Sequence, residues 1–404
     1  MGAPRHILIL TAGNLSRSPR PEKEAATLTR AGYRVTVLHP SERPHYDRLD
    51  AELAAAGGYE NISLVFDRTP FTRNARRLRR WLAVRTVPLG FEDVAALGAG
   101  RELLARARAH PADLTIVHNE LALWAGYRLL AEGWRVAADI EDWHSEDLQV
   151  SERRHRPLRL LRRVEGAMLR GAAYVSTTSA ALASALQQTY GGPRAAILTN
   201  SFPLQPDPRT APTTGSAPAF FWFSQTIGPG RGLEAFLQTW AQLPVPSRVV
   251  LLGEPRPGFP DHLRSLLPPD RRPQLEFLGL VPPPALPGVI ARHDIGLALE
   301  VSSIPNRDLT ITNKILQYLN AGLALVATPT AGQREVLQAA PHAGVLLDPN
   351  APDAALGTLT GWLRDPDQLR AVQRAARAAA ESTYCWEREA PRLLALVENA
   401  LTIR

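Results

Sequence analysis

Residues 313–337 read NKILQYLNAGLALVATPTAGQREVL, and this stretch combines a helix, a buried strand and the start of a second helix. Three polar residues, Asn313, Lys314 and Gln317, lie within one turn of the predicted first helix, which ends at Gly322. The apolar segment after Gly322 predicts a strand that is covered on both faces, as in a parallel sheet. The stretch therefore indicates an α/β domain with polar groups at one edge of its sheet.

The same alternation of short apolar runs and longer helical patterns extends over the whole chain. Continuous apolar runs separated by helices predict parallel strands with helices on both sides. The predicted strands are 6–10, 34–39, 61–66, 114–118, 135–140, 173–179, 195–200, 219–223, 248–253, 275–279, 295–300, 323–328 and 344–348. Both halves of the chain are accordingly predicted to be doubly wound, Rossmann-like domains.

The boundary between the two halves is a segment without periodicity, 203–217, in which proline, threonine and small residues dominate. We predict a first domain over 1–202, a linker over 203–217 and a second domain over 218–385. A final helix over 386–404 is expected to return to the first domain. Because ligands bind at the carboxyl ends of parallel strands, the two domains are expected to face a cleft.

Cys385 is the only cysteine among the 404 residues, so an internal disulfide and a cysteine-rich metal cluster are excluded. The first apolar run is too short for the core of a signal peptide, and no window is long enough to span a membrane. We therefore expect a cytoplasmic protein.

The chain carries 46 lysines and arginines against 39 acids, a net charge of 46 − 39 = +7. The excess is concentrated in 71–86, with six arginines and no acid, and in 153–170, with seven arginines and one glutamate. Basic amphipathic segments suit an anionic membrane surface, such as the inner face of the cell membrane, although solvated helix faces have the same pattern. Binding to nucleic acid is not expected, because no interleaved aromatic residues or reader motif are present.

Two helix starts in the second half have the composition of anion sites. The first begins near Thr312, where main-chain N–H groups and Lys314 would meet a negative charge. The second follows the strand at 219–223, where a glycine-rich loop carries Arg231. The glycines of that loop are Gly228, Gly230 and Gly232. Both starts are expected to contact one diphosphate.

With these motifs in place, residues 216–390 resemble the nucleotide-binding domain of the GT-B glycosyltransferases, specifically the retaining family 4. The resemblance rests on the order and spacing of several segments over about 170 residues. These segments are the glycine loop, LEFLGLVPPPALPGVIARHDIGLALE, TNKILQYLNAGLALVAT, AGQREVL, AGVLLDPN and YCWEREAPRLLAL.

The resemblance implies roles for individual residues. Arg231 and Lys314 would neutralise the diphosphate of a nucleotide sugar and so act as the main catalytic groups. The loop around Leu280 and Val281 would read the base through its backbone. Gln317 falls where the family usually has a glutamate that holds the ribose.

The sequence departs from the family pattern at this point. The family commonly carries two glutamates eight residues apart, whereas this chain has Leu309 and Gln317, with Asp308 next to the first. A glutamine cannot place a full charge near the ribose or accept hydrogen bonds as a carboxylate does. Either Asp308 moves into place or other groups such as Asn313 hold the sugar.

The first half matches the acceptor-binding half of such enzymes more loosely. Arg17 and Arg20 follow the first strand, where an anionic acceptor or the donor phosphate would lie, although solvated arginines are an equal interpretation. The resemblance implies that His118, at the end of the strand 114–118, contacts the donor sugar. Three further polar residues follow the strand at 135–140 and are assigned to the acceptor, namely Asp142, His144 and Glu146.

A metal bound by Asp142, His144 and Glu146 is an alternative, but the family typically needs none and no Asp-x-Asp site is present. The sequence therefore predicts a metal-independent glycosyltransferase that moves a sugar from a UDP or GDP sugar to a glycan or lipid-linked acceptor. Two alternatives stay open, a sugar-nucleotide 2-epimerase of the same fold and a catalytically silent sugar-nucleotide-binding protein.

Overall fold

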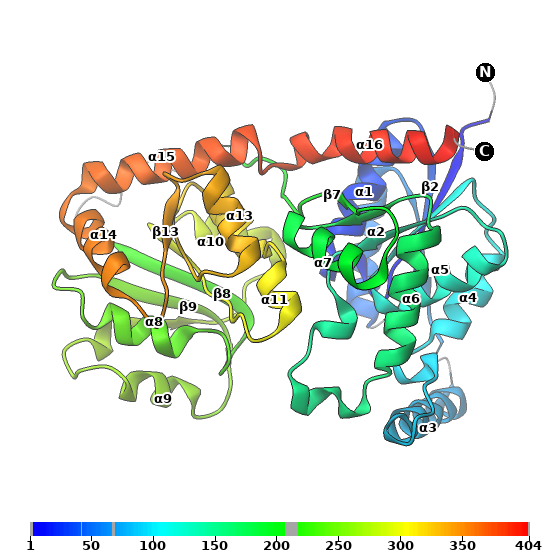
Figure 1. The fold of residues 1–404 in the computed structure, drawn as a ribbon, viewed down its shortest axis with the longest axis horizontal. Coiled ribbons are helices and arrows are strands. Elements are labelled where there is room, and N and C mark those ends of the chain that lie inside the picture. The colour runs from blue at the N-terminus through cyan, green and yellow to red at the C-terminus, as the bar shows by residue number, and fades with distance from the viewer. Residues whose placement is uncertain (1–2, 42, 67–68, 207–216, 403–404) are drawn as a thin grey trace. The chain divides into compact units, whose positions relative to one another are not determined.

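The computed structural model describes residues 3–41, 43–66, 69–206 and 217–402 (Figure 1). The chain divides into two compact units, unit 1 with Met1–Leu198 and Ala390–Arg404, and unit 2 with Thr199–Glu389. The division therefore lies slightly before the predicted linker and, on the return, inside the last helix. Most of that predicted linker, 207–216, is outside the described residues.

Unit 1 contains a seven-stranded sheet in the order β3-β2-β1-β4-β5-β6-β7, with each neighbouring pair parallel. Its strands are β1 (His6–Leu10), β2 (Arg34–Pro40), β3 (Glu60–Leu64), β4 (Leu114–His118), β5 (Val136–Ile140), β6 (Val175–Thr177) and β7 (Ala196–Ile197). Its helices are α1 (Pro19–Arg30), α2 (Pro44–Gly57), α3 (Pro70–Thr86), α4 (Gly100–Arg108), α5 (Asn119–Ala131), α6 (Leu158–Gly171) and α7 (Ala180–Tyr190).

Unit 2 contains a six-stranded parallel sheet in the order β10-β9-β8-β11-β12-β13. Its strands are β8 (Ala219–Ile227), β9 (Arg248–Pro255), β10 (Leu275–Leu278), β11 (Ile295–Ala298), β12 (Ala324–Ala327) and β13 (Gly344–Leu346). Its helices are α8 (Leu233–Trp240), α9 (Phe259–Ser265), α10 (Leu286–Ile290), α11 (Pro305–Leu309), α12 (Asn313–Asn320), α13 (Ala331–Ala339), α14 (Asp353–Arg364) and α15 (Pro366–Ser382).

The last helix, α16 (Trp386–Thr402), begins in unit 2 and continues in unit 1. Within unit 1 its end is tied to the first strand segment, because Arg5 Nη1 donates a hydrogen bond to the Leu401 carbonyl at 3.1 Å. In the described part of the chain, no helix is long and apolar enough to cross a membrane.

The predicted α/β fold class is confirmed, and each predicted strand overlaps an observed one. The largest extension beyond a predicted strand is in β8, which continues past the apolar run AFFWF to Ile227. Strands β6 and β7 are shorter than predicted. Its register shifts between Phe223 and Thr226, after which Thr226 and Ile227 pair with Glu254 and Pro255. The glycine-rich loop begins directly after this irregular extension of β8.

The run AFFWF explains why the second sheet is covered on both faces. Phe220 and Trp222 belong to one core, which includes residues of α8, α9 and α14. Phe221 points to the opposite core, which includes residues of α12, α13 and α15. Figure 1 shows α8 and α9 on one side of this sheet and α13 and α15 on the other. Because neighbouring side chains on a strand alternate, only a continuous apolar run fills both cores.

Close contact between α12 and the sheet depends on Gly296 in β11. A Cβ atom at Gly296 would lie 2.3 Å from the Tyr318 ring, which is fully buried. Tyr318 also packs edge-on against the rings of Phe221 and Phe223. The ring therefore cannot move aside without disturbing its aromatic neighbours.

We expect Gly296→Ala to destabilise unit 2 by about 1–3 kcal/mol, because overpacking a filled core forces side chains and backbone apart. Thermal and urea unfolding would measure the change. Gly279→Ala is the matched control, since a Cβ atom there meets nothing within 4 Å. Equal stability of the two variants would contradict the packing argument.

Candidate functional site

The candidate donor site lies at the edge of unit 2 where three neighbouring strands end. Strands β8, β11 and β12 are adjacent and parallel, so the loops that follow them share one edge of the sheet. These loops carry Arg231, Lys314 and the start of α13 at Ala331. The carboxyl edge of a parallel sheet is where such folds bind ligands.

The glycine-rich loop after β8 is shaped by two residues with positive φ, Gly230 (73°) and Gly232 (74°). Gly232 is the N-cap of α8, and a Cβ atom there would lie 3.3 Å from Leu299 Cβ. Arg307 Nη1 donates a hydrogen bond of 3.5 Å to the Gly230 carbonyl. Arg231, which is half-buried, is thereby held on a loop that packs against the end of β11.

Lys314 is held by a carboxylate that the sequence analysis missed. Its Nζ lies 2.6 Å from Glu300 Oε1, and the two side chains are only 12% and 5% exposed. The Thr328 hydroxyl accepts a hydrogen bond from the Glu300 amide and donates one to the Glu300 carbonyl, both at 2.8 Å. Glu300 was assigned only as the last residue of a predicted strand, although an acid at the carboxyl end of an apolar strand is itself a signal.

The start of α12 is not closed by a side-chain cap. Thr312 is the N-cap, yet its hydroxyl makes no cap hydrogen bond and is buried without a partner among the described residues. The Gln317 Oε1 atom is buried and unpartnered in the same way, whereas Asn313 is exposed. Main-chain N–H groups at an uncapped helix start favour an anion, and Lys314 lies in that first turn.

Asp308 forms a hydrogen bond to the start of α13. Its Oδ1 accepts a hydrogen bond of 3.3 Å from the Ala331 amide at the start of α13. This close approach requires Gly332, because a Cβ atom there would lie 2.3 Å from the Thr310 carbonyl oxygen. Asp308 thus links α11 to α13, and its carboxylate is only partly available to a ligand.

Gly228, Leu280 and Val281 complete the predicted donor residues. Gly228 is buried, and a Cβ atom there would lie 3.1 Å from the Arg256 side chain. Leu280 is 56% exposed after β10, while Val281 packs against the core that contains α12. A loop with one exposed and one anchored residue is compatible with contact to a base.

In unit 1, the loop after β1 is fixed by two polar residues that the sequence analysis did not single out. Asp50 accepts hydrogen bonds from the Leu15 and Ser16 amides at 3.1 and 2.7 Å. Asn119 has a φ of 64°, and its Oδ1 accepts from the Thr11 hydroxyl at 2.7 Å and the Ala12 amide at 3.3 Å. Asparagine tolerates this left-handed conformation, which recurs where backbone is fixed at functional sites.

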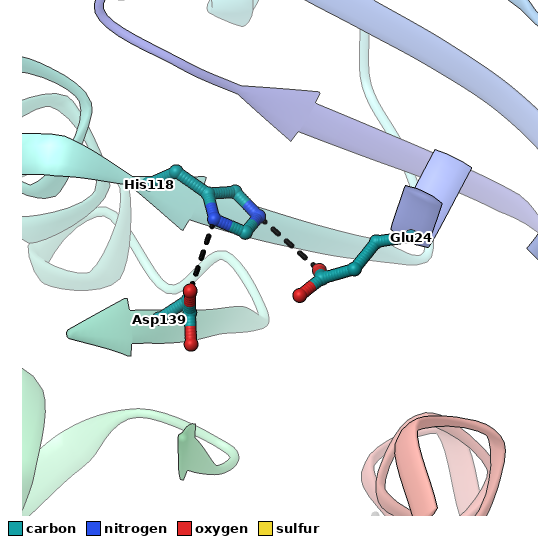
Figure 2. Close-up of side chains that lie close together, drawn as sticks. All are labelled: Glu24, His118 and Asp139. Atoms are coloured by element: carbon teal, nitrogen blue, oxygen red, sulfur yellow. Dashed lines mark ion pairs between the residues drawn. The ribbon is translucent and has the colours of Figure 1, made fainter. Parts of the chain in front are cut away.

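His118 lies in a fully buried charge cluster with Glu24 and Asp139 (Figure 2). Its Nε2 is 3.2 Å from Glu24 Oε2, and its Nδ1 is 3.2 Å from Asp139 Oδ2. Arg20 Nε lies 2.6 Å from the same Asp139 oxygen, and Arg20 Nη2 donates to Asp139 Oδ1 at 2.6 Å. A third contact runs from Arg20 Nη1 to the Leu198 carbonyl at 2.7 Å.

Two positive and two negative side chains face one another in this cluster. Both ring nitrogens of His118 face carboxylates, and only a doubly protonated ring can donate in both directions. Burial by itself would lower the pKa of His118, but the carboxylates of Glu24 and Asp139 outweigh it and raise that pKa to about 10. Burial would raise the pKa of Asp139, yet the Arg20 guanidinium and His118 hold it well below its usual range. Arg20 and His118 thus neutralise Glu24 and Asp139.

Neither Arg20 nor His118 has an exposed side chain in this structure. The burial argues against the predicted direct contacts, of His118 with a donor sugar and of Arg20 with an acceptor. We therefore reassign both residues to the support of the loops at the carboxyl ends of β1, β4 and β5. A buried arginine cannot be recognised from a sequence in which it appears beside exposed arginines.

Glu24, His118 and Asp139 also have the side chains of a metal site, because one ligand atom from each lies within 4.8 Å of the others. Arg20, however, contacts the same Asp139 oxygen that faces His118. Metal ligands must be deprotonated, and a further divalent charge would oppose two cations that already balance the carboxylates. The geometry fits an ion-pair network better than a metal centre.

The other residues predicted to bind the acceptor have different surroundings. Arg17 is exposed and lies over the Tyr46 ring at 5.5 Å. Glu146 forms ion pairs of 2.8 Å with both Arg153 and Arg162. His144 is buried and Asp142 is half-buried at the end of β5. The structure does not gather Asp142, His144 and Glu146 into a common set of ligands.

The charge cluster predicts a specific pH dependence of stability. A base whose pKa is raised by folding contributes stability that is fully present below its unfolded pKa, about 6.5 for histidine, and is lost as pH rises through the folded value. His118→Gln should destabilise unit 1 by about 3–5 kcal/mol below pH 6.5, because it leaves buried carboxylates unpaired. The difference from the wild type should shrink toward pH 10.

Urea unfolding measured from pH 5 to pH 10 would give this difference. His45→Gln is the control, since His45 is exposed on α2 and should not alter the profile. A constant difference between His118→Gln and the wild type over the whole range would contradict a protonated His118.

Comparison with known proteins agrees with this description. Residues 19–202 match the sequence profile of the family described as "Glycosyl transferase 4-like domain", and residues 231–395 match the one described as "Glycosyl transferase-like". No curated protein sequence matches the chain. The chain belongs to the glycosyltransferases with family 4-like domains, and its two parallel α/β domains have the GT-B architecture.

Solved structures show the same fold at low sequence identity. Sucrose-phosphate synthase from Thermosynechococcus elongatus is 13% identical, with a TM-score of 0.68 and 98% of each chain covered. Anabaena HepE in complex with UDP and glucose is 17% identical, with a TM-score of 0.68 over 98% of this chain and 99% of that one. WaaG, a glycosyltransferase involved in lipopolysaccharide biosynthesis, is 14% identical, with a TM-score of 0.61 over 96% and 99%.

Proposed function

We propose that this glycosyltransferase moves a sugar from a UDP sugar to a hydroxyl of an acceptor held by unit 1, with retention of anomeric configuration. The observation that carries the proposal is the pairing of two cationic loops at one sheet edge. Arg231 lies on the glycine loop after β8, and Lys314 lies in the uncapped first turn of α12 after the neighbouring β11. UDP is favoured over GDP because HepE, which has the same fold, was solved with UDP and glucose.

The reaction needs stabilisation of the leaving group above all. As the bond between the anomeric carbon and the phosphate oxygen breaks, negative charge accumulates on the diphosphate, and cations placed there in advance stabilise that state. The acceptor hydroxyl forms the new bond to the anomeric carbon on the same face. Its proton passes to the departing phosphate oxygen, so no protein nucleophile and no metal are required.

Glu300 gives Lys314 a defined position before the donor arrives. The ion pair at 2.6 Å keeps the ammonium group at the start of α12 rather than in solvent. When a diphosphate binds, it becomes a second counter-ion for the same ammonium group. Preorganised charge of this kind lowers the reorganisation needed during reaction.

Gln317 stands where the family usually has a glutamate that holds the ribose, so groups other than that glutamate must make the contact. Gln317 Oε1 is buried without a partner and can accept a hydrogen bond from a ribose hydroxyl. Asp308 already accepts the Ala331 amide, so its insertion into the ribose site would have to compete with that contact. We therefore assign the ribose contact to Gln317 and, at the exposed rim, to Asn313.

Replacing Arg231 or Lys314 by alanine should lower kcat/KM for transfer from UDP-glucose by at least about 100-fold, the usual loss when one charge-stabilising group is removed. Both variants should still fold, because neither side chain belongs to a core cluster. Lys314→Ala leaves the Glu300 carboxylate, 5% exposed, without this partner, so thermal unfolding is measured beside turnover. Arg370→Ala is the control, since Arg370 is exposed on α15 and pairs with a neighbouring exposed acid, Asp367.

Product analysis would separate this proposal from its alternatives. Release of UDP on addition of acceptor indicates transfer, interconversion of the donor sugar indicates an epimerase, and binding without turnover indicates a silent sugar-nucleotide sensor. The glycosyltransferase profiles over both halves favour transfer. Wild-type turnover in the Arg231 or Lys314 variant would contradict the diphosphate assignment.

We also propose that unit 1 contacts an anionic membrane through α3. Figure 1 shows α3 at the margin of unit 1, beyond its sheet. Ala83 is the buried residue among its described side chains, while Phe71, Leu78 and Leu82 are 82%, 59% and 48% exposed. These three residues are spaced seven and four apart and share one face of the helix. Flanking arginines and an outward apolar stripe are the features of a helix that lies in a membrane interface.

Substituting Phe71 and Leu82 with serine should weaken binding to phosphatidylglycerol vesicles by about tenfold or more, because each buried apolar side chain contributes roughly 1.5–3 kcal/mol. Vesicle co-sedimentation would measure it, with turnover on a soluble acceptor expected to stay unchanged. Substituting Leu280, an exposed leucine of unit 2, with serine serves as control. Undiminished vesicle binding by the α3 variant would exclude this helix as the contact.

A further inference from the structure

A basic cavity lies beneath α3 at the carboxyl edge of the first sheet. It measures about 360 Å³ and is lined by four arginines of that helix, Arg76, Arg77, Arg79 and Arg80. The one acidic residue in its lining is Glu102, whose carboxylate lies 3.5 Å from Arg79. The lining therefore carries a formal charge of 4 − 1 = +3.

The position of this cavity marks it as part of the ligand-binding edge. Its other walls include Ala12 after β1, Ser41 after β2 and Leu121 at the start of α5 after β4. These strands are neighbours in the sheet, and ligands of open parallel sheets bind outside the carboxyl ends of their strands. The Ala12 amide in this wall donates a hydrogen bond of 3.3 Å to Asn119 Oδ1.

A second hollow lies next to the first, and a larger share of its surface is apolar. It measures about 810 Å³, and one part of its lining is apolar, with Trp81, Val84, Pro88 and Leu89. The rest of the lining is basic, with Arg77, Arg80, Arg85, Arg154 and His155. Arg77 and Arg80 line both spaces, so the basic cavity and the apolar hollow are immediate neighbours. Trp81 of α3 and Leu89, which lies just after that helix, are 50% and 73% exposed. Exposed large apolar side chains that lie close together mark binding surfaces.

A cation-lined cavity beside a hollow with an apolar wall is complementary to a molecule with a phosphate head and a hydrocarbon chain. Arginine forks bind phosphate oxygens in pairs, and a cavity of a few hundred Å³ is large enough for a phosphorylated group. The neighbouring cavity lined by Arg101 and Arg108 lacks this excess, because those arginines pair with Asp93 and Glu132.

We propose that unit 1 binds an amphiphilic phosphate or diphosphate as the acceptor, with its anionic group among Arg76, Arg77, Arg79 and Arg80 and its chain against Trp81 and Leu89. The assignment rests on the proposed transferase function, for which it names the substrate class. It places recognition of the acceptor on α3, away from the buried Arg20 and His118.

Calorimetric binding of farnesyl diphosphate, inorganic pyrophosphate and farnesol tests this assignment. Arg76→Gln combined with Arg80→Gln should weaken farnesyl diphosphate binding by about tenfold or more, since two charged contacts to phosphate are lost. Arg106→Gln combined with Arg163→Gln is the control, because it removes the same charge from exposed positions of unit 1 outside both spaces. Trp81→Ala combined with Leu89→Ala should weaken farnesyl diphosphate but not pyrophosphate.

Binding of UDP-glucose, measured in parallel, keeps the two proposals distinguishable. Lys314→Ala should lose UDP-glucose binding and retain farnesyl diphosphate binding, while the Arg76 and Arg80 variant should do the reverse. Farnesyl diphosphate binding that is unchanged in the Arg76 and Arg80 variant, or reduced equally in the control, overturns the acceptor assignment and leaves the donor site standing. Equal binding of pyrophosphate and farnesyl diphosphate overturns the role of the apolar hollow.

Discussion

The structure depends on the burial of two parallel sheets on both faces. Because the faces are filled by continuous apolar strands such as AFFWF, polar chemistry is confined to the edges where strands end. In unit 2 the strands β8, β11 and β12 deliver Arg231, Lys314 and the start of α13 to one such edge. The close contacts of Gly296 with Tyr318 and of Gly332 with Thr310 fix that edge to the core.

Charged side chains at the carboxyl edges of the two sheets differ in burial and in the number of their counter-ions. In unit 1, Arg20 and His118 are compensated by two carboxylates and excluded from the surface. In unit 2, Lys314 has one carboxylate partner and remains 12% exposed beside an uncapped helix start. The first arrangement stabilises loops, whereas the second leaves a cation able to meet an incoming diphosphate.

Sequence reasoning succeeded where a pattern has one physical explanation. Apolar runs located the strands, and the glycines around Arg231 were correctly placed in a tight loop before a helix. It failed for single polar residues, whose surroundings come from distant segments. Glu300 was missed because its partner Lys314 lies in another element. The helix begins near Thr312 as predicted, but the Thr312 hydroxyl makes no cap hydrogen bond.

The sequence by itself determined the strand order along the chain, the parallel α/β class and the family, because these follow from periodicity and from motif spacing. Only the tertiary structure decided which charged residues are buried and which line a cavity. Arg20 and Arg76 are chemically identical, yet one meets Asp139 inside unit 1 and the other faces the space beneath α3. Burial depends on contacts between residues far apart in the chain, and local composition does not encode them.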